Sequence, residues 1–560
     1  MSADLLALVS APPSSGVDLT ALVGSSLRWV GPATQAAQRV ADLETKLSPR
    51  WVWWSARTDA AATVRAGVLL RRCHDLAEVH RLLYGRWSAA PEDVWATAHG
   101  IPLDEVAQAP PDDLFAVVDE SPRLVGQDGL LRGDALSGRW LNTPERLIQW
   151  AEAALTCAAH QLGHPRSRAA PLTFATESAT ALLCLELERD GLPIDRSRLE
   201  ALITKVAGER PLSLADEADR RRERDALVLA HAPGREGTDL RNPAAVKELL
   251  AGAGIEVPDT RKWTLEPYAA TSALVRSLLA WRAAERIATT YGWRWLDTHV
   301  GADDRLRGAW TACDGGAGRM TAEAGLHNLP VLLRPGVAAH AGRVLVRADL
   351  GQIEPRILAA VSADRAFVEA SAADDLYAPV AARLGVERPV AKIAVLAAMY
   401  GQRSGAAGEA LAGLERAFPQ AMAVLDAAYA AGLRGEPVLT HGGRLVHTRA
   451  GPSSPVPGSD PGVDRARGRF ARNAVIQGAA AEFFKAWVAL LRQRLRPLGA
   501  EVVLCLHDEV LVHAPAQHAE EVVGQLHASL SEVGRWWFPG VPVRFVADAG
   551  VLSRWSEAKG

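Results

Sequence analysis

One stretch, RPVAKIAVLAAMYG, constrains this chain more than any other, because four side chains recur in it at a spacing of four. They are Arg388, Lys392, Leu396 and Tyr400. On an α-helix this spacing places them in one row along one face. A proline in the first turn and Gly401 directly after the last periodic residue are typical helix ends. The stretch therefore predicts a helix that presents two cations, an apolar side chain and an aromatic ring.

Such a row suits a ligand with a polyphosphate at one end and a base or sugar at the other, as in a nucleoside triphosphate. Most of the 62 basic residues are arginines, so the lysine at position 392 is not the default cation of this chain. A lysine ammonium, unlike an arginine, can be tuned to lose a proton, as a general acid that protonates a departing pyrophosphate must do. An ordinary amphipathic helix with a solvated basic edge explains the row as well, so the rest of the chain has to decide.

The composition is that of a globular protein with several domains, since 560 residues exceed one core and 48% of them are hydrophobic. A net charge of −3 gives no overall nucleic-acid signature, so nucleic-acid binding must depend on local basic surfaces. The five scattered cysteines favour a reducing compartment and exclude a zinc or disulfide framework. No signal peptide or membrane span is evident, and we expect a cytoplasmic, nucleoid-associated protein.

Periodicity predicts alternating strands and helices in the first part of the chain and mostly helices from 174 to 299. Strands are predicted at 51–54, 67–70, 342–349, 502–515 and 540–547, and helices at 35–47, 58–66, 75–84 and 143–162. A segment rich in proline between Gly163 and Pro171 indicates a domain boundary.

Two acidic positions stand where strands end. Asp349 closes the apolar run that begins at Val344, and a helix is predicted directly after it. Asp508 and Glu509 lie in the polar tip between two apolar runs, which reads as a hairpin. Aspartates from two such segments could share two Mg²⁺ ions, since Mg²⁺ prefers hard oxygen ligands and leaves positions for phosphates. A solvated turn alone would also explain the tip, but not its combination with Asp349 and the cation row.

These segments resemble motifs of the DNA polymerase I family, also called family A. Asp349 to Ser362 resembles its first palm motif, Arg388 to Gly401 its finger-helix motif, and Leu506 to Glu509 its last palm motif. Further matches are GRMT at 318–321, RFARNAVIQG at 469–478, and LERDGLPID at 187–195. The resemblance covers about 180 to 553.

The resemblance implies an α/β multidomain fold: an RNase H-like exonuclease-type α/β domain followed by a right-hand polymerase with a helical thumb, an antiparallel-sheet palm and helical fingers. We expect the exonuclease-like domain at 1–170, the thumb at 171–300, palm segments at 301–363 and 436–560, and fingers at 364–435. No 5′-nuclease domain is expected.

The resemblance also assigns roles to single residues. Catalysis falls to Asp349, Asp508, Glu509 and Lys392, with Asp349 and Asp508 as ligands of two Mg²⁺ ions. Nucleotide binding falls to Arg388, Lys392, Leu396, Tyr400, Glu354, Gln352 and His507, where Glu354 excludes a ribose 2′-hydroxyl. Arg319, Arg469, Asn473 and Gln477, with His507, would contact the minor groove of the primer-template, and Arg465, Arg467, Arg469 and Arg472 would supply positive charge for DNA.

The chain departs from the family pattern at two places. Leu396 stands where the family usually has Phe or Tyr, which predicts weaker nucleotide binding and altered discrimination at the sugar 3′ position. In the exonuclease-like domain only Asp59 has a plausible place among the metal-binding acids. Asp42 and Glu44 fall in a helical pattern, where a solvated face is the simpler interpretation, and Glu152 falls near the third motif. We expect no proofreading activity there.

The predicted function is DNA-templated DNA synthesis by a monomer that binds primer-template DNA and deoxynucleoside triphosphates and no membrane. Two alternatives stay open: a bifunctional polymerase and 3′–5′ exonuclease, and a catalytically weak DNA-binding scaffold. The segments that flank the finger helix look short, which bears on processivity and fidelity.

Overall fold

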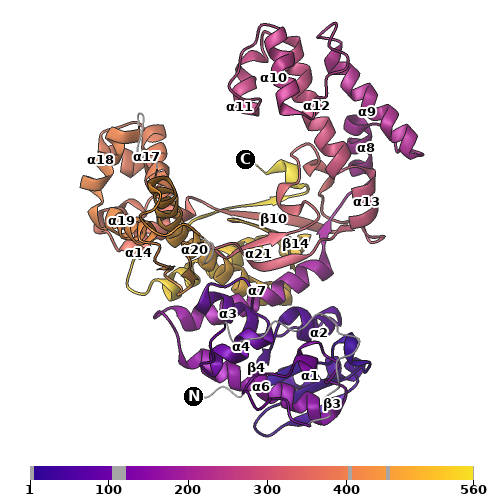
Figure 1. Cartoon of the computed structure of the whole chain (residues 1–560), viewed down its shortest axis with the longest axis vertical. Coiled ribbons are helices and arrows are strands. Elements are labelled where there is room, and N and C mark those ends of the chain that lie inside the picture. The colour runs from indigo at the N-terminus through magenta and orange to yellow at the C-terminus, as the bar shows by residue number, and fades with distance from the viewer. Residues whose placement is uncertain (1–4, 104–121, 402–406, 450–453, 559–560) are drawn as a thin grey trace. The chain divides into compact units, whose positions relative to one another are not determined.

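The computed structural model describes residues 5–103, 122–401, 407–449 and 454–558. The chain forms two compact units, which are described separately (Figure 1). The first comprises residues 1–190, 309–322 and 346–551, and the second comprises 191–308, 323–345 and 552–560. The domain boundaries predicted above are finer than this division and stay a prediction.

The first unit begins with a five-stranded sheet in the order β3-β2-β1-β4-β5. Its strands are β1 (Leu5–Ser10), β2 (Thr20–Val23), β3 (Arg28–Gly31), β4 (Arg50–Trp53) and β5 (Arg72–Asp75). The first three strands pair antiparallel, whereas β4 and β5 run parallel to β1. The helices are α1 (Ala33–Leu47), α2 (Ala61–Arg65), α3 (Leu76–Tyr84), α4 (Pro91–Ala98), α5 (Gly133–Leu136) and α6 (Pro144–Gly163). The predicted helices at 35–47, 75–84 and 143–162 are confirmed.

Two predicted strands are wrong in position. The apolar residues at 67–70 form no strand, because Gly67 turns the chain with φ of 82°, and β5 begins only at Arg72. The last strand, β15 (Ala547–Leu552), starts where the prediction for 540–547 ends. The strands β1, β2 and β3 were not predicted, although the buried run of β1 supplies the centre of the sheet.

A second sheet of the first unit has the order β13-β14-β10-β15. Its strands β10 (Arg343–Leu350), β13 (Glu501–Leu506) and β14 (Glu509–Pro515) confirm the predicted strand at 342–349 and the predicted hairpin. Before β10 in the sequence, β8 (Trp310–Asp314) and β9 (Arg319–Ala322) form a hairpin. A shorter hairpin consists of β11 (Val438–Leu439) and β12 (Leu445–Val446).

Helices from the middle of the chain complete this unit. They are α14 (Ile353–Ser362), α15 (Arg365–Ala370), α16 (Tyr377–Leu384), α17 (Arg388–Tyr400), α18 (Ala407–Ala417), α19 (Pro419–Leu433) and, after β14, α21 (Ala519–Trp537). The helix α17 is the one predicted from the four-residue spacing, and it ends at Gly401 in the left-handed conformation, with φ of 70°.

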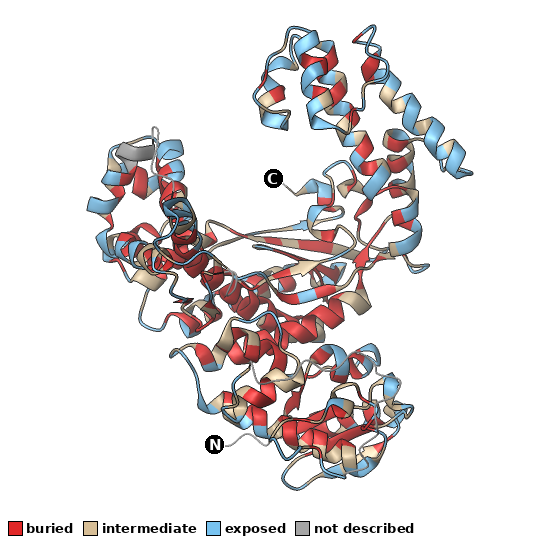
Figure 2. Cartoon of the chain, viewed as in Figure 1, coloured by how far each residue is buried: buried red, intermediate tan, exposed pale blue. Residues whose placement is uncertain are grey.

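Two helices form the interior of the first unit: α7 (Ala170–Asp190) and α20 (Pro461–Leu495) (Figure 2). By length and hydropathy α20 could cross a membrane, but 83% of its most apolar window is buried in the protein. Core helices of soluble proteins share this composition, so α20 gives no reason to revise the expectation of no membrane partner. The interior of the helix pair also holds charge, because Lys485 of α20 donates to Glu177 of α7 at 2.7 Å.

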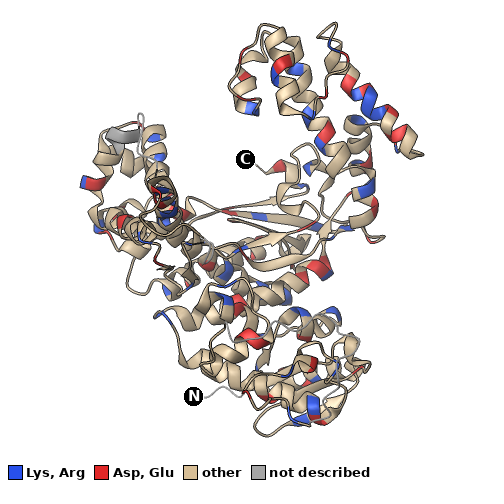
Figure 3. Ribbon diagram, in the orientation of Figure 1, with Lys and Arg blue, Asp and Glu red and all other residues tan. Residues whose placement is uncertain are grey.

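The second unit is mainly helical. It contains α8 (Arg196–Ala207), α9 (Leu214–Leu229), α10 (Pro243–Gly252), α11 (Lys262–Leu265), α12 (Ala273–Thr290) and α13 (Trp293–His299), with β6 (Leu192–Pro193) paired to β7 (Arg305–Leu306). Acidic and basic residues are mixed along α9 (Figure 3). Glu285 of α12 accepts ion pairs from Arg224 and Arg241, so part of this charge holds the unit together.

Candidate active site

Three carboxylates predicted for catalysis come from neighbouring strands of the second sheet. Asp349 lies near the end of β10, and Asp508 lies in the tight turn between β13 and β14, directly before Glu509. A hydrogen bond from the Leu350 amide to the Asp508 carbonyl, 2.8 Å long, ties the end of β10 to this turn. His507 closes the turn with φ of 25°, a conformation that costs energy for a residue with a Cβ atom. The sheet therefore brings two distant acidic segments to one place.

The electrostatics show how closely these acids lie. Burial, and after it the charge of Asp508, raises the pKa of Asp349 to about 6. Burial also raises the pKa of Asp508, and Glu509 adds to that rise. A fourth acid, Asp548 on β15, contributes to the shift of Asp349 and was not predicted. Clustered carboxylates whose charges oppose one another form a donor set that a divalent cation would stabilise.

Arg347 is a second residue that the sequence analysis missed. Its guanidinium lies 2.8 Å from Oδ2 of Asp349 and 3.0 Å from Oε1 of Glu509, and only 12% of its side chain is exposed. The cation therefore balances two of the acids. Arg347 precedes Asp349 by two residues on a strand, so the two side chains lie on the same face of the sheet. This spacing is the sequence signal from which Arg347 could have been predicted.

The row on α17 is exposed as the spacing predicts, apart from Leu396, which is half-buried. Arg388 forms an ion pair with Asp375, which lies just before α16. Gln352 holds the same carboxylate by a 2.9 Å hydrogen bond, and its Oε1 accepts from the Leu376 amide. Gln352, which was predicted to bind a nucleotide, therefore positions Asp375 in this structure, and Arg388 has an acidic partner.

Arg356 supports this corner from inside the protein. Its side chain is fully buried and donates to the carbonyls of Gly351, Ser371, Ala373 and Asp374. Burial, followed by the nearby Arg544, lowers the pKa of Arg356 to about 10. One guanidinium thus joins the start of α14 to the loop that carries Asp375.

A pocket of about 250 Å³ lies beside the acids and gathers residues from six segments. Glu354 is its central acid, since it forms an ion pair with Arg319 at 3.2 Å and accepts from the Tyr400 hydroxyl at 3.4 Å. With its amide oxygen facing Arg319, Gln477 accepts from that guanidinium at 2.6 Å. The pocket brings together these predicted residues: Arg319, Gln352, Glu354, Leu396, Tyr400, Gln477, His507 and Asp508.

The remaining predicted residues lie around this pocket and do not line it. Lys392 is exposed one turn before Leu396, and Arg469 and Asn473 lie on α20 within two turns of Gln477. Burial lowers the pKa of His507, and the cation of Arg319 adds to this effect.

Two arginines predicted to supply charge for DNA have other roles. Arg472 is buried and donates to the carbonyl of Ala398 at 2.6 Å, and its other partner is Asp426 of α19. Arg467 is buried as well and pairs with Asp464, one turn away. Both are internal ties of the first unit, so the prediction is wrong for these two residues, whereas Arg465 and Arg469 are exposed.

Asp59 is the acid of the first-sheet region that was predicted as a metal ligand. Asp59 is buried and accepts hydrogen bonds from the amides of Ser10, Trp54 and Ser55, and burial raises its pKa to about 7. At the end of β1, facing Asp59, stands Ser10 rather than an acid. Among the described residues, the one group of acids and cysteines close enough to hold a metal does not include Asp59.

The other three acids named for the exonuclease-type site also have partners within the protein. Glu44 is buried and accepts from the Trp51 indole at 2.7 Å, which corrects the expectation of a solvated face. Asp42 accepts from Gln38 on the same helix, and Glu152 forms an exposed ion pair with Arg28. None of the three contacts Asp59 through a described hydrogen bond.

Comparison with known proteins agrees with the motifs. Residues 245–433 match the model of the DNA polymerase family A. The thermostable DNA polymerase I of Thermus thermophilus is 27% identical over 433 residues, covering 70% of this chain and 48% of that protein. DNA polymerase I of Deinococcus radiodurans is 28% identical over 331 residues, covering 53% of this chain and 33% of that protein. The chain thus spans about half the length of the first relative and a third of the length of the second.

A solved structure shows the same fold. It is the POL domain of Pol1 from M. smegmatis in complex with DNA primer-template and dNTP, with a TM-score of 0.69 and 19% identity over 99% of this chain and 96% of that chain. Residues 245–433 thus resemble DNA polymerase family A, and the fold of the chain is similar to that of a polymerase domain.

Proposed function

We propose that this chain is a DNA-templated DNA polymerase that adds deoxynucleotides to a primer 3′-hydroxyl. The observation that carries the proposal is one pocket in which the gate acid Glu354, the aromatic Tyr400 and the acid Asp508 meet, beside Asp349. Primer-template DNA and deoxynucleoside triphosphates are the proposed ligands. The protein would act as a monomer. Its five cysteines are free and buried, which fits the reducing cytoplasm, where the protein would lie near the nucleoid.

The carboxylate donors fit two Mg²⁺ ions, with Asp349 and Asp508 as ligands and Glu509 in support. When bound, such ions lower the pKa of an attacking hydroxyl and neutralise the leaving phosphates. The primer 3′-oxygen forms a bond to the α-phosphorus, and the bond from that phosphorus to the bridging oxygen of the pyrophosphate breaks.

Side chains of α17 would hold the other end of the nucleotide. Arg388 exchanges Asp375 for the triphosphate, and Lys392 donates a proton to the departing pyrophosphate. Leu396 and Tyr400 lie further along the same face, beside the sugar and the base. Glu354 is held by Arg319 and Tyr400, so its carboxylate is positioned to exclude a 2′-hydroxyl.

We also propose that the first sheet belongs to an RNase H-like domain of the exonuclease type that does not cut. Its strand order, with three antiparallel strands followed by two parallel ones, supports the fold. The isolation of Asp59 from other acids supports the lack of chemistry, since two metals need several carboxylates. The predicted domains, with this domain at 1–170, thumb at 171–300, fingers at 364–435 and palm at 301–363 and 436–560, remain our assignment.

A labelled primer-template incubated with Mg²⁺, with and without the four deoxynucleotides, tests both proposals. The wild type and Asp59→Ala should extend the primer, and Asp349→Ala and Asp508→Ala should not. No protein should shorten the primer when nucleotides are omitted. Shortening that disappears in Asp59→Ala would establish a bifunctional enzyme, and a wild type that binds the DNA without extending it would establish a scaffold.

A further inference from the structure

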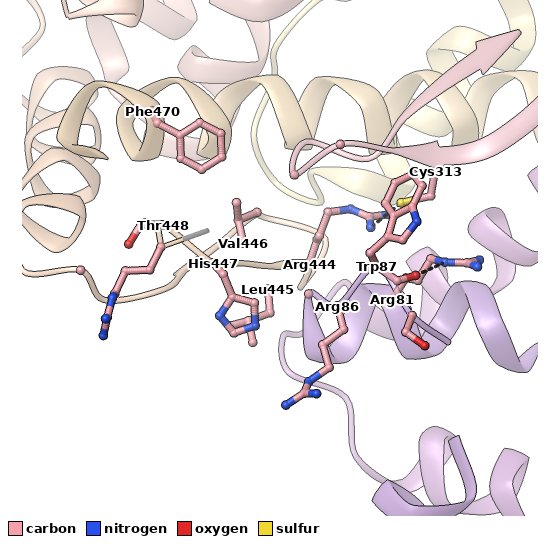
Figure 4. A pocket seen from close by; sticks show the side chains of 16 residues that line it. Arg81, Arg86, Trp87, Cys313, Arg444, Leu445, Val446, His447, Thr448 and Phe470 are labelled. Carbon is pink, nitrogen blue, oxygen red and sulfur yellow. Dashed lines mark hydrogen bonds between the residues drawn. The ribbon is translucent and has the colours of Figure 1, made fainter. Parts of the chain in front are cut away.

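A second cavity of the first unit lies outside the site described above. It has a volume of about 950 Å³ and is lined by the end of α3 with residues 85–88, the β8–β9 turn, residues 444–449, and Phe470 of α20 (Figure 4). We call it the α3–α20 groove. Phe470 precedes Gln477 by seven residues, about 10 Å along the helix. The groove therefore begins two turns from the pocket that holds Glu354.

The charge of the groove is one-sided. Its lining includes four arginines and a histidine and no acidic residue, although the whole chain has a net charge of −3. Arg81 and Arg444 are neutralised from behind by Glu78 and Glu177. Arg86 is exposed and makes no ion pair within the described part of the chain.

Arg449 offers a further donor to this cavity. Its Nε is buried without a hydrogen-bond partner among the described residues, while another nitrogen of the same guanidinium donates to the carbonyl of Ser454. Arginines with free donors in a groove without acids are suited to phosphate oxygens, which they can bind through paired hydrogen bonds.

Two aromatic rings border the same cavity from different elements. Trp87 is 69% exposed and Phe470 is 45% exposed, and both are labelled in Figure 4. What distinguishes these two rings is that they border one cavity together, where their faces are open to a flat ligand. A tight turn keeps Phe470 accessible, because Gly316 lies so close that a Cβ there would come within 3.1 Å of its ring.

We propose that the α3–α20 groove binds single-stranded DNA, with phosphates on Arg86 and Arg449 and bases stacked on Trp87 and Phe470. Rings that stack bases and cations that follow the backbone are the general means of binding single strands without reading sequence. The volume is that of a site for drug-sized ligands, so it accommodates roughly two nucleotides. The proposal takes DNA as substrate from the proposed function, and the unpaired strand is either template ahead of the primer or a frayed primer end.

The test measures binding by fluorescence anisotropy on three labelled primer-templates: a one-nucleotide template overhang, a long template overhang, and a mismatched primer 3′ end on the short overhang. The variant is Arg86→Ala/Trp87→Ala. The control is Arg65→Ala/Trp536→Ala, which removes the same charge and another exposed indole outside the groove.

Wild type and control should bind one of the unpaired substrates about tenfold more tightly than the short overhang, and the groove variant should lose this preference. The slope of the logarithm of the binding constant against the logarithm of the salt concentration should be about one unit shallower for the variant, since it releases about one counterion fewer. A preference for the long overhang assigns the groove to template, and a preference for the mismatch assigns it to the primer end. Equal affinities of the groove variant and the control for every substrate would overturn the proposal.

Single-nucleotide extension on the short overhang separates this result from the proposed function. The groove variant should extend that substrate as the wild type does, because neither residue lines the pocket of Glu354. A wild type that fails to extend would overturn the polymerase proposal, while the binding preference still decides the groove.

Discussion

At the scale of single residues, Arg347 and the acids around it show how the site is held together. Its guanidinium pairs with Asp349 and Glu509 in surroundings with little water, and such pairs are costly to break from one side. The same cation occupies carboxylate oxygens that a metal would also use. Arg347 is therefore expected to stabilise the metal-free protein and to compete with divalent cations.

Arg347→Met should lower the free energy of unfolding by about 2 kcal/mol in EDTA, since it removes hydrogen bonds between charged groups. Mg²⁺ should recover more of the stability of the variant than of the wild type, because the acids then depend on the ion. Urea unfolding in EDTA and in Mg²⁺ measures both. Arg365→Met breaks an exposed pair with Glu369 and should show neither effect. An equal loss with and without Mg²⁺ would mean that Arg347 is only structural.

Leu396 tests the nucleotide side of the pocket. Leu396→Phe adds an aromatic surface beside Tyr400, so nucleotide KM should fall and discrimination at the sugar 3′ position should change. Steady-state incorporation of deoxy- and dideoxynucleotides measures this. Ile393→Phe, on the exposed side of the same helix, is the matched control and should leave both unchanged. Unaltered kinetics in Leu396→Phe would refute the assigned role.

Asp59 gives a prediction for pH. Its pKa is raised to about 7 by burial, so the folded protein keeps a proton that the unfolded chain releases above its ordinary value near 4. Stability therefore falls as pH rises from about 4 to 7, by up to about 1.4 kcal/mol per pH unit for this group. Asp59→Asn should reduce that slope in urea unfolding at pH 5, 6 and 7. Asp42→Asn, at a partly exposed position, should not, and identical slopes in all three proteins would contradict the assignment.

At the scale of elements, α19 and α20 pack closely at Gly432. A Cβ there would lie 2.6 Å from the Arg467 carbonyl and 2.8 Å from the Ala471 side chain. Gly432→Ala should therefore destabilise the protein by about 1–3 kcal/mol, as overpacking does. Gly524→Ala in α21, where nothing lies within 4 Å, should instead stabilise by about 0.5–1 kcal/mol. Thermal unfolding distinguishes the two, and a stable Gly432→Ala protein would show that the helices can separate.

Elements with strong periodicity or a turn between apolar runs could be predicted from the sequence, as α17 and the β13–β14 hairpin show. The strands β1 to β3 could not, because short apolar runs near one end carry no period that separates strand from helix. The site was predicted where motifs carry it, at Asp349, Glu354 and Asp508. Arg356 and Asp375 were not predicted because their contacts, with residues 15 and 13 positions away, follow neither a motif nor a helical or strand period.

At the scale of the whole molecule, buried charges join the first sheet and its neighbours to α20. Although burial alone would raise it, the cations of Arg444 and Lys485 hold the pKa of Glu177 below its ordinary value. Further along α20, Arg492 pairs with Glu186 and donates to the Leu70 carbonyl at 2.9 Å. The region of the first sheet is thus bonded directly to the helix that carries Gln477.

Removing two members of this network together should cost less than the sum of the two separate losses. Lys485→Met leaves a buried acid with one cation fewer and should lower the free energy of unfolding by about 3–5 kcal/mol. Glu177→Gln/Lys485→Met should cost less than the sum of the single variants, which urea unfolding and a double-mutant cycle measure. Arg494→Met, which breaks a more exposed pair with Glu532, is the control. Additive losses would show that the two charges act independently.

The helix α20 extends this bonding through the first unit. It spans 35 residues without a break, about 50 Å. Arg492 fixes one end to the region of the first sheet, and Asn473 and Gln477 lie further back along the same helix. Because a continuous helix bends little, a shift of the first-sheet region would move these two side chains with it.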